Sequence, residues 1–180
     1  MLAVRNKDRH FEDKVEETLT PQALGFFLED KVNETLKSHL RYYDFILREK
    51  EVKSKYGVNN SGIDHLISIN NYIFCIQCKW ENISSPIGKV NHFLMCINNI
   101  AKEHPEKKCI GIYLSKLPVS GPSERALSTN YIYSINIDNN GSDDMDCIIE
   151  KLLIFFHYCF GIYSFEYDES LIMRYSNLWN

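Results

Sequence analysis

The chain has 180 residues, of which 44% are hydrophobic and 24% are charged, and its net charge at pH 7 is -4. These values are ordinary for a globular protein and predict one domain without internal repeats or low-complexity linkers. The mild acidity does not favour a nucleic-acid binder, since such domains are often strongly basic, but a local basic patch would be enough for one. The most apolar stretch, residues 152–156, is far too short to cross a bilayer.

Two further features of the sequence bear on its compartment and organisation. The amino terminus lacks the apolar segment of a secretory signal. Six cysteines in a chain without a secretory signal are expected to be reduced thiols, which is typical of intracellular proteins. We therefore expect a protein of the cytoplasm or the nucleus, with no membrane segment. We expect a single domain over residues 20–160, with a charged lead-in at 1–19 and a C-terminal extension at 161–180.

The first predicted helix begins at a clear start signal. Thr20 is followed by Pro21, a pair suited to the N-cap and to the first helical position. The helix is predicted to run from residue 21 to about residue 40. A strand at 42–49, rich in Tyr, Phe, Ile and Leu, and a loop at 57–62, rich in Asn and Gly, are predicted to follow it.

A β-hairpin is predicted next, with strands at 63–69 and 72–80 joined by a tight turn at Asn70 and Asn71. The remaining elements alternate in type. They are a helix at 87–103, strands at 109–115 and 131–138, and a helix from 142 to about 158. This succession predicts an α/β domain with a central mixed β-sheet flanked by helices.

Polar residues gather at the open end of the predicted hairpin. Side chains alternate along a strand, so Gln77 and Lys79 share one face of the second strand, whose two faces are otherwise apolar. A lysine ammonium that leaves a buried strand needs a negative partner, and Asp64 on the neighbouring strand or a bound phosphate would be within reach. Taken singly, Lys79 is more often a solvated strand end and Asp64 a turn residue. Together they indicate a site that cleaves phosphodiesters.

A second acid joins this site through helical geometry. Residues advance about 100° each around a helix, so Leu36 and Leu40 lie within about 20° of Glu29. Glu29 is therefore predicted to face the sheet, whereas Glu34 points to solvent. A carboxylate on a buried helix face is a candidate site residue, although a Glu at the edge of the apolar stripe remains the structural alternative.

These residues resemble the motifs of the PD-(D/E)xK nuclease superfamily, whose fold is called restriction-endonuclease-like. They are most similar to its Mrr-like and Holliday-junction-resolvase-like members, which often carry Gln-x-Lys in place of Glu-x-Lys. The matched residues are 25–29 with Val32 and Leu36, then Gly62, Ile63 and Asp64, then 76–80. The resemblance covers about residues 20–115 and implies a core in the order αβββαβ.

The resemblance also implies roles for these residues. Asp64 would ligate a divalent metal, Mg²⁺ or Mn²⁺, and Gln77 would offer its amide oxygen to the metal or orient the water. The backbone carbonyl of Cys78 would be a further ligand, and Glu29 would complete the metal shell or hold a water in its second shell. Lys79 would position or activate the attacking water and offset charge on the phosphate. Gln77 departs from the acid of many relatives, so less negative charge holds the metal.

The function that follows from the resemblance is a metal-dependent endonuclease that hydrolyses DNA phosphodiester bonds, of the Mrr-like restriction type. Two alternatives stay open. One is a Holliday-junction resolvase that acts as a homodimer on branched DNA. The other is a catalytically inactive module that keeps the fold and binds nucleic acid.

Other residues receive structural interpretations. Cys75 and Cys78 are three positions apart on a strand and face opposite sides, which makes them a poor metal pair and better core thiols. His65 is predicted to point away from Asp64. Five scattered basic residues could supply a phosphate-binding surface, but such residues are usually solvated: Lys89, Lys107, Lys108, Lys116 and Arg125. Ser61 could contact a phosphate but is better explained as a loop-capping serine. The others are interpreted as structural histidines and as acids that stabilise a helix start: His92, His157, Asp143, Asp144 and Asp146.

Overall fold

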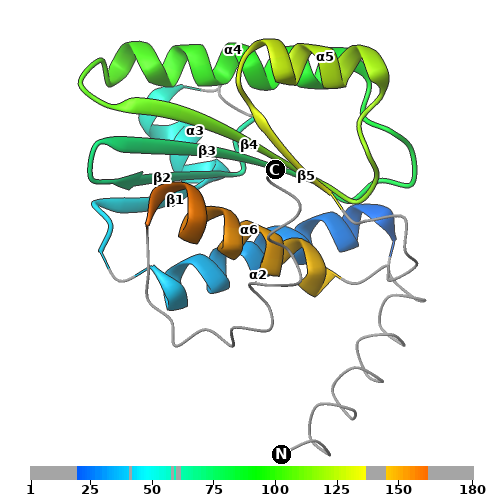
Figure 1. The fold of residues 1–180 in the computed structure, drawn as a ribbon, viewed down its shortest axis with the longest axis horizontal. Helices are drawn as coiled ribbons and strands as arrows, with labels where there is room; N and C mark the ends of the chain where they lie inside the picture. The colour runs from blue at the N-terminus through cyan, green and yellow to red at the C-terminus, as the bar shows by residue number, and fades with distance from the viewer. Residues whose placement is uncertain (1–19, 41, 58, 60–61, 137–144, 162–180) are drawn as a thin grey trace, which may run out of the picture.

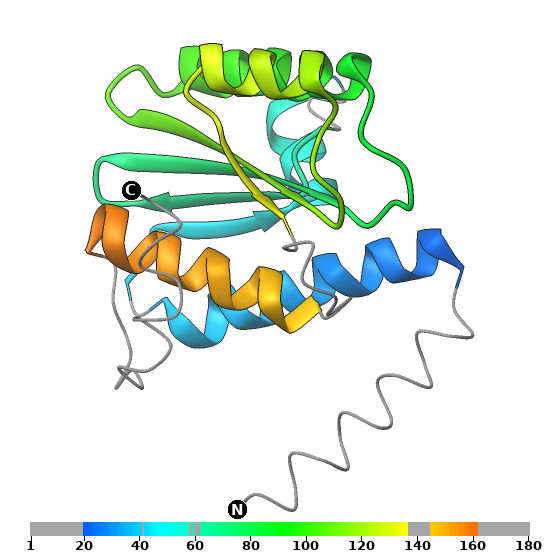
Figure 2. The same ribbon diagram turned by 45° about the vertical axis from the view of Figure 1, so that its right-hand side comes forward.

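The computed structural model describes residues 20–40, 42–57, 59, 62–136 and 145–161. They form an α/β structure in which one mixed sheet of five strands lies between two layers of helices (Figure 1). Two helices cover one face of the sheet and three lie on the side of the other, an arrangement that the turned view shows again (Figure 2). The predicted fold class, an α/β domain with a mixed sheet flanked by helices, is confirmed.

The strands follow each other across the sheet in chain order. They are β1 (Phe45–Arg48), β2 (His65–Ile69), β3 (Tyr72–Lys79), β4 (Lys108–Ser115) and β5 (Tyr133–Asn136). The pairs β1–β2 and β2–β3 are antiparallel, whereas β3–β4 and β4–β5 are parallel. Strand β3 is therefore central, which explains why both of its faces are apolar in the sequence.

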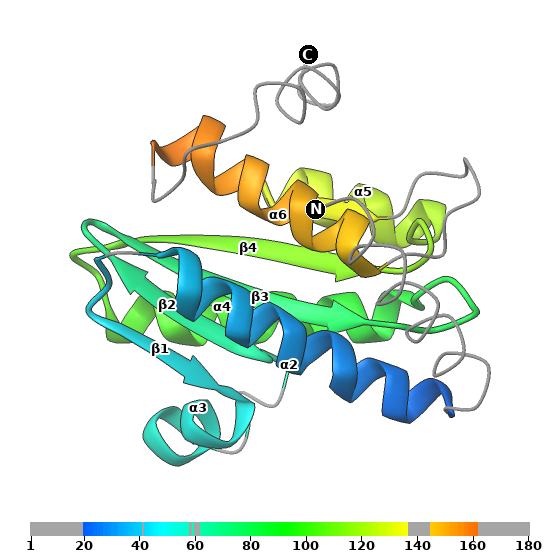
Figure 3. The same cartoon turned by 90° about the horizontal axis from the view of Figure 1, so that it is seen from below.

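The helices are α2 (Pro21–His39), α3 (Glu49–Tyr56), α4 (Ile87–Glu103), α5 (Gly121–Thr129) and α6 (Met145–Phe160). Helices α2 and α6 lie side by side across one face of the sheet (Figure 3), where the Phe74 and Phe156 rings meet edge to face at 4.8 Å. On the other face, Phe93 of α4 packs against Tyr113 of β4 at 5.8 Å between ring centroids. The β3 side chains thus alternate between two separate cores.

Two local predictions are confirmed by the backbone. Thr20 caps α2, since its hydroxyl oxygen accepts a hydrogen bond from the Ala23 amide at 3.2 Å. The turn between β2 and β3 lies at Asn70 and Asn71, where Asn70 adopts a left-handed φ of 51°. Asparagine tolerates that conformation better than other non-glycine residues, so the register of the hairpin is fixed at this point.

The strand predicted at 42–49 is wrong at both ends. Its regular part is Phe45–Arg48, and Glu49 already begins α3, a helix that the sequence pattern does not reveal. Helix α3 has one buried residue, Val52, so no apolar period marks it. Local polar contacts stabilise it instead: Glu51 accepts a hydrogen bond from the Arg48 amide at 2.8 Å, and Glu49 pairs with Lys53 at 2.7 Å.

One further helix and the boundaries of two strands differ from the prediction. Helix α5 was also not predicted, because it is short and buries only Ser123 and Leu127. Strand β2 begins at His65, not at residue 63, and leaves Asp64 just before the strand. The strand predicted at 131–138 is described as Tyr133–Asn136, while residues 137 and 138 lie outside the described chain, as do the lead-in at 1–19 and most of the extension at 161–180.

No helix within the described ranges has both the length and the apolar character needed to span a bilayer.

Candidate active site

Asp64 is held at the open end of the hairpin by β3. Its amide donates to the carbonyl oxygen of Ile76 at 2.9 Å, which extends the β2–β3 pairing by one residue. Its Oδ2 atom accepts two hydrogen bonds, one from the Cys78 amide at 2.6 Å and one from the side-chain amide of Gln77. The side chain of Asp64 is thereby oriented by two neighbours of the same strand and is 5% exposed.

Gln77 and Lys79 lie on the same face of β3, as predicted from their spacing. Gln77 is buried, and Lys79 is half-buried at the last position of the strand. The Gln77 amide nitrogen faces Asp64 and also lies 3.5 Å from the Cys78 carbonyl oxygen. For the amide oxygen to face a cation beside Asp64, as the resemblance implies, the end of the side chain must turn over.

Glu29 reaches the same end of the sheet from α2. It lines a cleft of about 290 Å³ together with Lys79 and Cys78 of β3. The rest of the cleft wall comes from the start of α2 and from the segment after β3: Pro21, Gln22, Gly25, Phe26, Trp80 and Glu81. Glu29 is half-buried, whereas Glu34 is exposed, which agrees with the predicted orientation of both side chains.

The two acids lie in an electrostatic environment that opposes their ionisation. Burial, and after it the negative charge of Asp64, raises the pKa of Glu29 to about 7 against the lowering effect of Lys79. Burial likewise raises the pKa of Asp64 to about 6, against the lowering effect of Lys79 and of the Cys78 amide. One lysine therefore compensates two carboxyl groups incompletely. A further cation at this position would relieve the imbalance.

The donor atoms of the site suit a hard divalent cation. Asp64 and Glu29 offer carboxylate oxygens, Gln77 an amide oxygen and Cys78 a backbone carbonyl, which are the ligand types that Mg²⁺ prefers. Across the described parts of the chain, no group of three or more His, Cys, Asp and Glu side chains is placed to hold a metal. Any cation here would therefore depend on the neutral oxygens of Gln77 and Cys78, and the donor types fit that demand once the Gln77 amide turns over.

The thiols and the imidazole near Asp64 do not belong to this donor set. Cys75 and Cys78 carry free thiols that belong to opposite cores, as predicted, and burial raises the pKa of both. His65 is fully buried, and burial lowers its pKa to about 4, so it is neutral near pH 7. His92 lies on α4 within 3.8 Å of the Cys96 sulfur. Ser61, Asp143 and Asp144 lie outside the described residues.

Several basic residues that were interpreted as solvated have defined neighbours. Lys89 pairs with Glu81, and the Lys116 ammonium lies 5.4 Å above the Trp80 ring, so both lie beside residues that line the cleft. Asp146 lies in the first turn of α6, as predicted, and pairs with Lys31 at 2.7 Å. Two ammonium groups thus lie near the cleft, although Lys89 is already paired with an acid and the chain as a whole is acidic.

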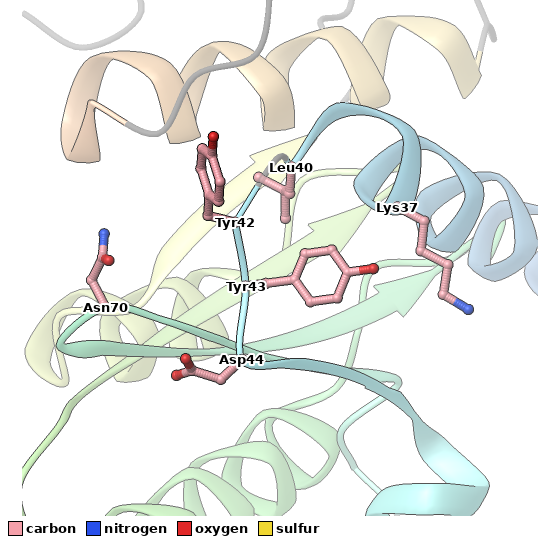
Figure 4. A pocket seen from close by; sticks show the side chains of 6 residues that line it. All are labelled: Lys37, Leu40, Tyr42, Tyr43, Asp44 and Asn70. Carbon is pink, nitrogen blue, oxygen red and sulfur yellow. The ribbon is translucent and has the colours of Figure 1, made fainter.

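A second hollow, of about 450 Å³, lies at the opposite end of the hairpin, beside its turn. Figure 4 shows the six residues that line it: Lys37, Leu40, Tyr42, Tyr43, Asp44 and Asn70. Its one acid, Asp44, accepts hydrogen bonds from Lys107 at 2.5 Å and from Ser68 at 2.7 Å, and these contacts lower its pKa. This hollow has a satisfied carboxylate and therefore lacks the charge imbalance of the cleft.

The cleft wall contains residues that the sequence did not single out. Phe26 is an exposed aromatic residue three positions before Glu29 on the same helix. This spacing, which puts two side chains on one side of a helix, is the sequence signal that could have added Phe26 to the site. A search of protein-family models found no match to this chain, and neither did a search of curated protein sequences. The function is therefore inferred from the residues of the site and their surroundings.

Proposed function

We propose that this protein is a metal-dependent endonuclease that hydrolyses DNA phosphodiester bonds, with a fold of the PD-(D/E)xK type. The observation that carries the proposal is the hydrogen bond between Asp64 and Gln77 at the open end of the hairpin, beside the cleft that Glu29 and Lys79 line. The charge of Lys79 lowers the pKa of both Asp64 and Glu29, so its ammonium lies near both acids. Two under-compensated acids beside a lysine suit a cation and a phosphate together, because the cation offsets the acids and the lysine attracts the phosphate.

The succession of elements supports the proposed fold. Helix α2, strands β1 to β3, helix α4 and strand β4 follow in the order αβββαβ, with α3 inserted between β1 and β2. Strands β2 and β3 are antiparallel and bring Asp64 opposite Gln77. Helix α2 crosses the hairpin and brings Glu29 to its open end.

The metal would be held by the Asp64 and Glu29 carboxylates, the Cys78 carbonyl and the Gln77 amide oxygen. When bound, Mg²⁺ or Mn²⁺ supplies Lewis-acid stabilisation of the phosphate and lowers the pKa of bound water. The remaining work falls to the side chains. Lys79 orients the attacking water and the phosphate oxygens, and its ammonium offsets the charge that grows on the phosphate. The Cys78 amide keeps Asp64 oriented toward this position.

The inactive binding module remains the second candidate, and Gln77 is the observation that favours it. The Gln77 amide already donates to Asp64, so a hydrogen bond partly replaces the cation that the carboxylate would otherwise need. A neutral amide also contributes no charge to metal binding. Gln77→Glu separates the two candidates: a gain of cleavage in this variant, with none in the unchanged protein, would identify a silent site.

The main experiment is incubation of the protein with plasmid, linear and four-way-junction DNA, with Mg²⁺ or Mn²⁺ and with EDTA. Cleavage is expected with metal and not with EDTA. Lys79→Met should reduce the rate by about 100-fold or more. The matched control is Lys107→Met, because Lys107 pairs with Asp44 at the other end of the sheet. Equal rates for the two variants would show that the site is assigned wrongly, and binding without cleavage would favour the inactive module.

A further inference from the structure

Phe26 is both exposed to solvent and part of the cleft wall. It exposes 56% of its surface to solvent, although phenylalanine is among the residues most often buried. It also lines the cleft that contains Glu29 and Lys79. Phe26 lies three residues before Glu29 on α2, so both side chains project to the same side of the helix. An exposed aromatic beside a polar site indicates a surface that binds a flat apolar group.

The wall of the cleft is divided in the way that a nucleotide is divided. Glu29, Lys79 and Glu81 supply charged groups, of which Glu81 is paired with Lys89. Phe26, Pro21 and Trp80 supply apolar surface. A nucleotide likewise joins a charged phosphate to a flat base. With a phosphate beside Lys79, the attached base would lie toward the Phe26 ring, and base stacking on an aromatic side chain is a recurrent mode of single-strand recognition.

The size of the cleft limits what enters it. About 290 Å³ is at the lower end of the range for small-molecule sites, which is enough for one nucleotide and far too little for a double helix. Within a continuous duplex, each base is covered on both faces by its stacked neighbours. A base has a free face for Phe26 only where the strand is unpaired or the stack is interrupted.

We propose that Phe26 stacks on an unpaired base next to the scissile phosphate, so that the substrate is single-stranded or branched DNA rather than continuous duplex. This inference rests on the proposed nuclease function and names its substrate class. Phe26 acts as a specificity-determining residue: it selects DNA whose base can leave the stack, and it leaves the chemistry to Lys79 and the acids.

The neighbouring Phe27 provides a matched control. It is the same residue type on the same helix and is 39% exposed, but it does not line the cleft. Its ring lies instead near the Lys31 ammonium, 5.7 Å from the centroid. Because both phenylalanines are substantially exposed, replacing either one removes little core packing, and the melting temperatures of both variants should stay near that of the unchanged protein.

The first test compares cleavage rates with Mg²⁺ on a single strand, a blunt duplex of the same sequence and a branched flap. The unchanged protein should prefer the single strand and the flap to the duplex by about tenfold or more. Phe26→Ala should lower kcat/KM on the single strand and on the flap by about tenfold or more, because the stacking ring is lost. Phe26→Trp should keep kcat/KM near that of the unchanged protein, and Phe27→Ala should change it by no more than about twofold. Equal cleavage of duplex and single strand, or equal rates for Phe26→Ala and Phe27→Ala, would overturn the inference.

The second test measures binding without cleavage. A single strand that carries 2-aminopurine is mixed with the full chain in EDTA, and its fluorescence reports stacking of the base. Quenching is expected with the unchanged protein and with Phe27→Ala and should be lost with Phe26→Ala. If quenching depends on Phe26 but no substrate is cut, Phe26 binds a base as inferred and the proposed nuclease function is wrong. If cleavage requires Asp64 and Lys79 but both tests are insensitive to Phe26, only this inference fails.

Discussion

The two ends of the β2–β3 hairpin carry acids in opposite electrostatic conditions. Beside the turn, Asp44 accepts hydrogen bonds from Lys107 and Ser68, and its pKa is lowered. At the open end, Asp64 is buried and the pKa is raised to about 6, and Glu29 nearby has a pKa of about 7. The same sheet therefore satisfies one carboxylate and leaves two others in need of positive charge.

Under the proposed function, this difference separates a structural acid from a functional one better than residue type does. A paired acid such as Asp44 stabilises the fold when it is ionised. Buried acids with too little compensation cost stability when they ionise, and a fold retains them where a ligand supplies the missing charge. The comparison makes definite predictions, because substitutions at the two ends should differ in their effect on activity, on metal response and on the pH dependence of stability.

The largest expected difference is in catalysis. Asp64→Asn keeps the size of the side chain and removes its charge, and it should lower the cleavage rate by about 100- to 1,000-fold. Asp44→Asn makes the same change at the other end and should leave the rate within about twofold, because Asp44 lies beside the turn. The measurement is the initial rate of cleavage with Mg²⁺ on the DNA that the unchanged protein cuts fastest. A comparable loss in both variants would indicate that the cleavage rate depends on the net charge of the protein and not on the position of Asp64.

Binding of a metal should stabilise the protein through Asp64 and not through Asp44. Mg²⁺ at about ten times its dissociation constant should stabilise the protein by about 1.4 kcal/mol, since it binds the folded site and not the unfolded chain. That corresponds to a rise of about 4 °C in melting temperature. The rise should disappear in Asp64→Asn and persist in Asp44→Asn. A rise of the same size in Asp64→Asn, measured by thermal unfolding, would place the metal elsewhere.

The pH dependence of stability gives the third contrast. Because the pKa of Glu29 is raised to about 7, its contribution to stability is complete below its ordinary value near 4.5 and is lost as the pH rises toward 7. Glu29→Gln should remove that loss. In EDTA near pH 8 it should stabilise the protein by about 1 kcal/mol, a figure reduced for the partial exposure of the side chain.

Urea unfolding near pH 5 and near pH 8 measures this effect. The stabilising effect of Glu29→Gln should shrink at the lower pH, where the unchanged Glu29 is already protonated. Glu34→Gln is the control, because Glu34 is exposed on the same helix. If Glu29→Gln is less stable than the unchanged protein near pH 8, the pKa of Glu29 is not raised.

The sequence predicted the elements whose signals are local or periodic. The cap at Thr20, the turn at Asn70 and the alternation of β3 all depend on a few neighbouring residues, and the structure has them as predicted. Helix α3 escaped prediction because polar contacts around Glu49 and Glu51 stabilise it, while only Val52 is buried. A short helix of this kind has no apolar period from which it can be recognised.

The positions of the candidate residues could be predicted from the sequence, but their contacts could not. Strand alternation places Gln77 beside Lys79, and helical periodicity turns Glu29 toward the sheet. The Gln77 amide faces Asp64 with its nitrogen because of hydrogen bonds across the hairpin. The spacing of residues in the sequence does not predict this orientation. The role of Phe26 in the cleft wall likewise depends on how α2 crosses β3, a packing feature that appears only in three dimensions.

The smallest expected effect is at the structural end of the hairpin. Since the pKa of Asp44 is lowered by Lys107 and Ser68, its contribution to stability is present above its ordinary value of 3.8 and is lost as the pH falls. Asp44→Asn should lower the melting temperature by about 2 °C near pH 7, because a largely exposed ion pair is screened by water and salt. The loss should become smaller in high salt and toward pH 3. Glu29→Gln changes stability in the opposite direction and at higher pH, so equal signs for the two variants near pH 8 would remove the distinction between the two ends.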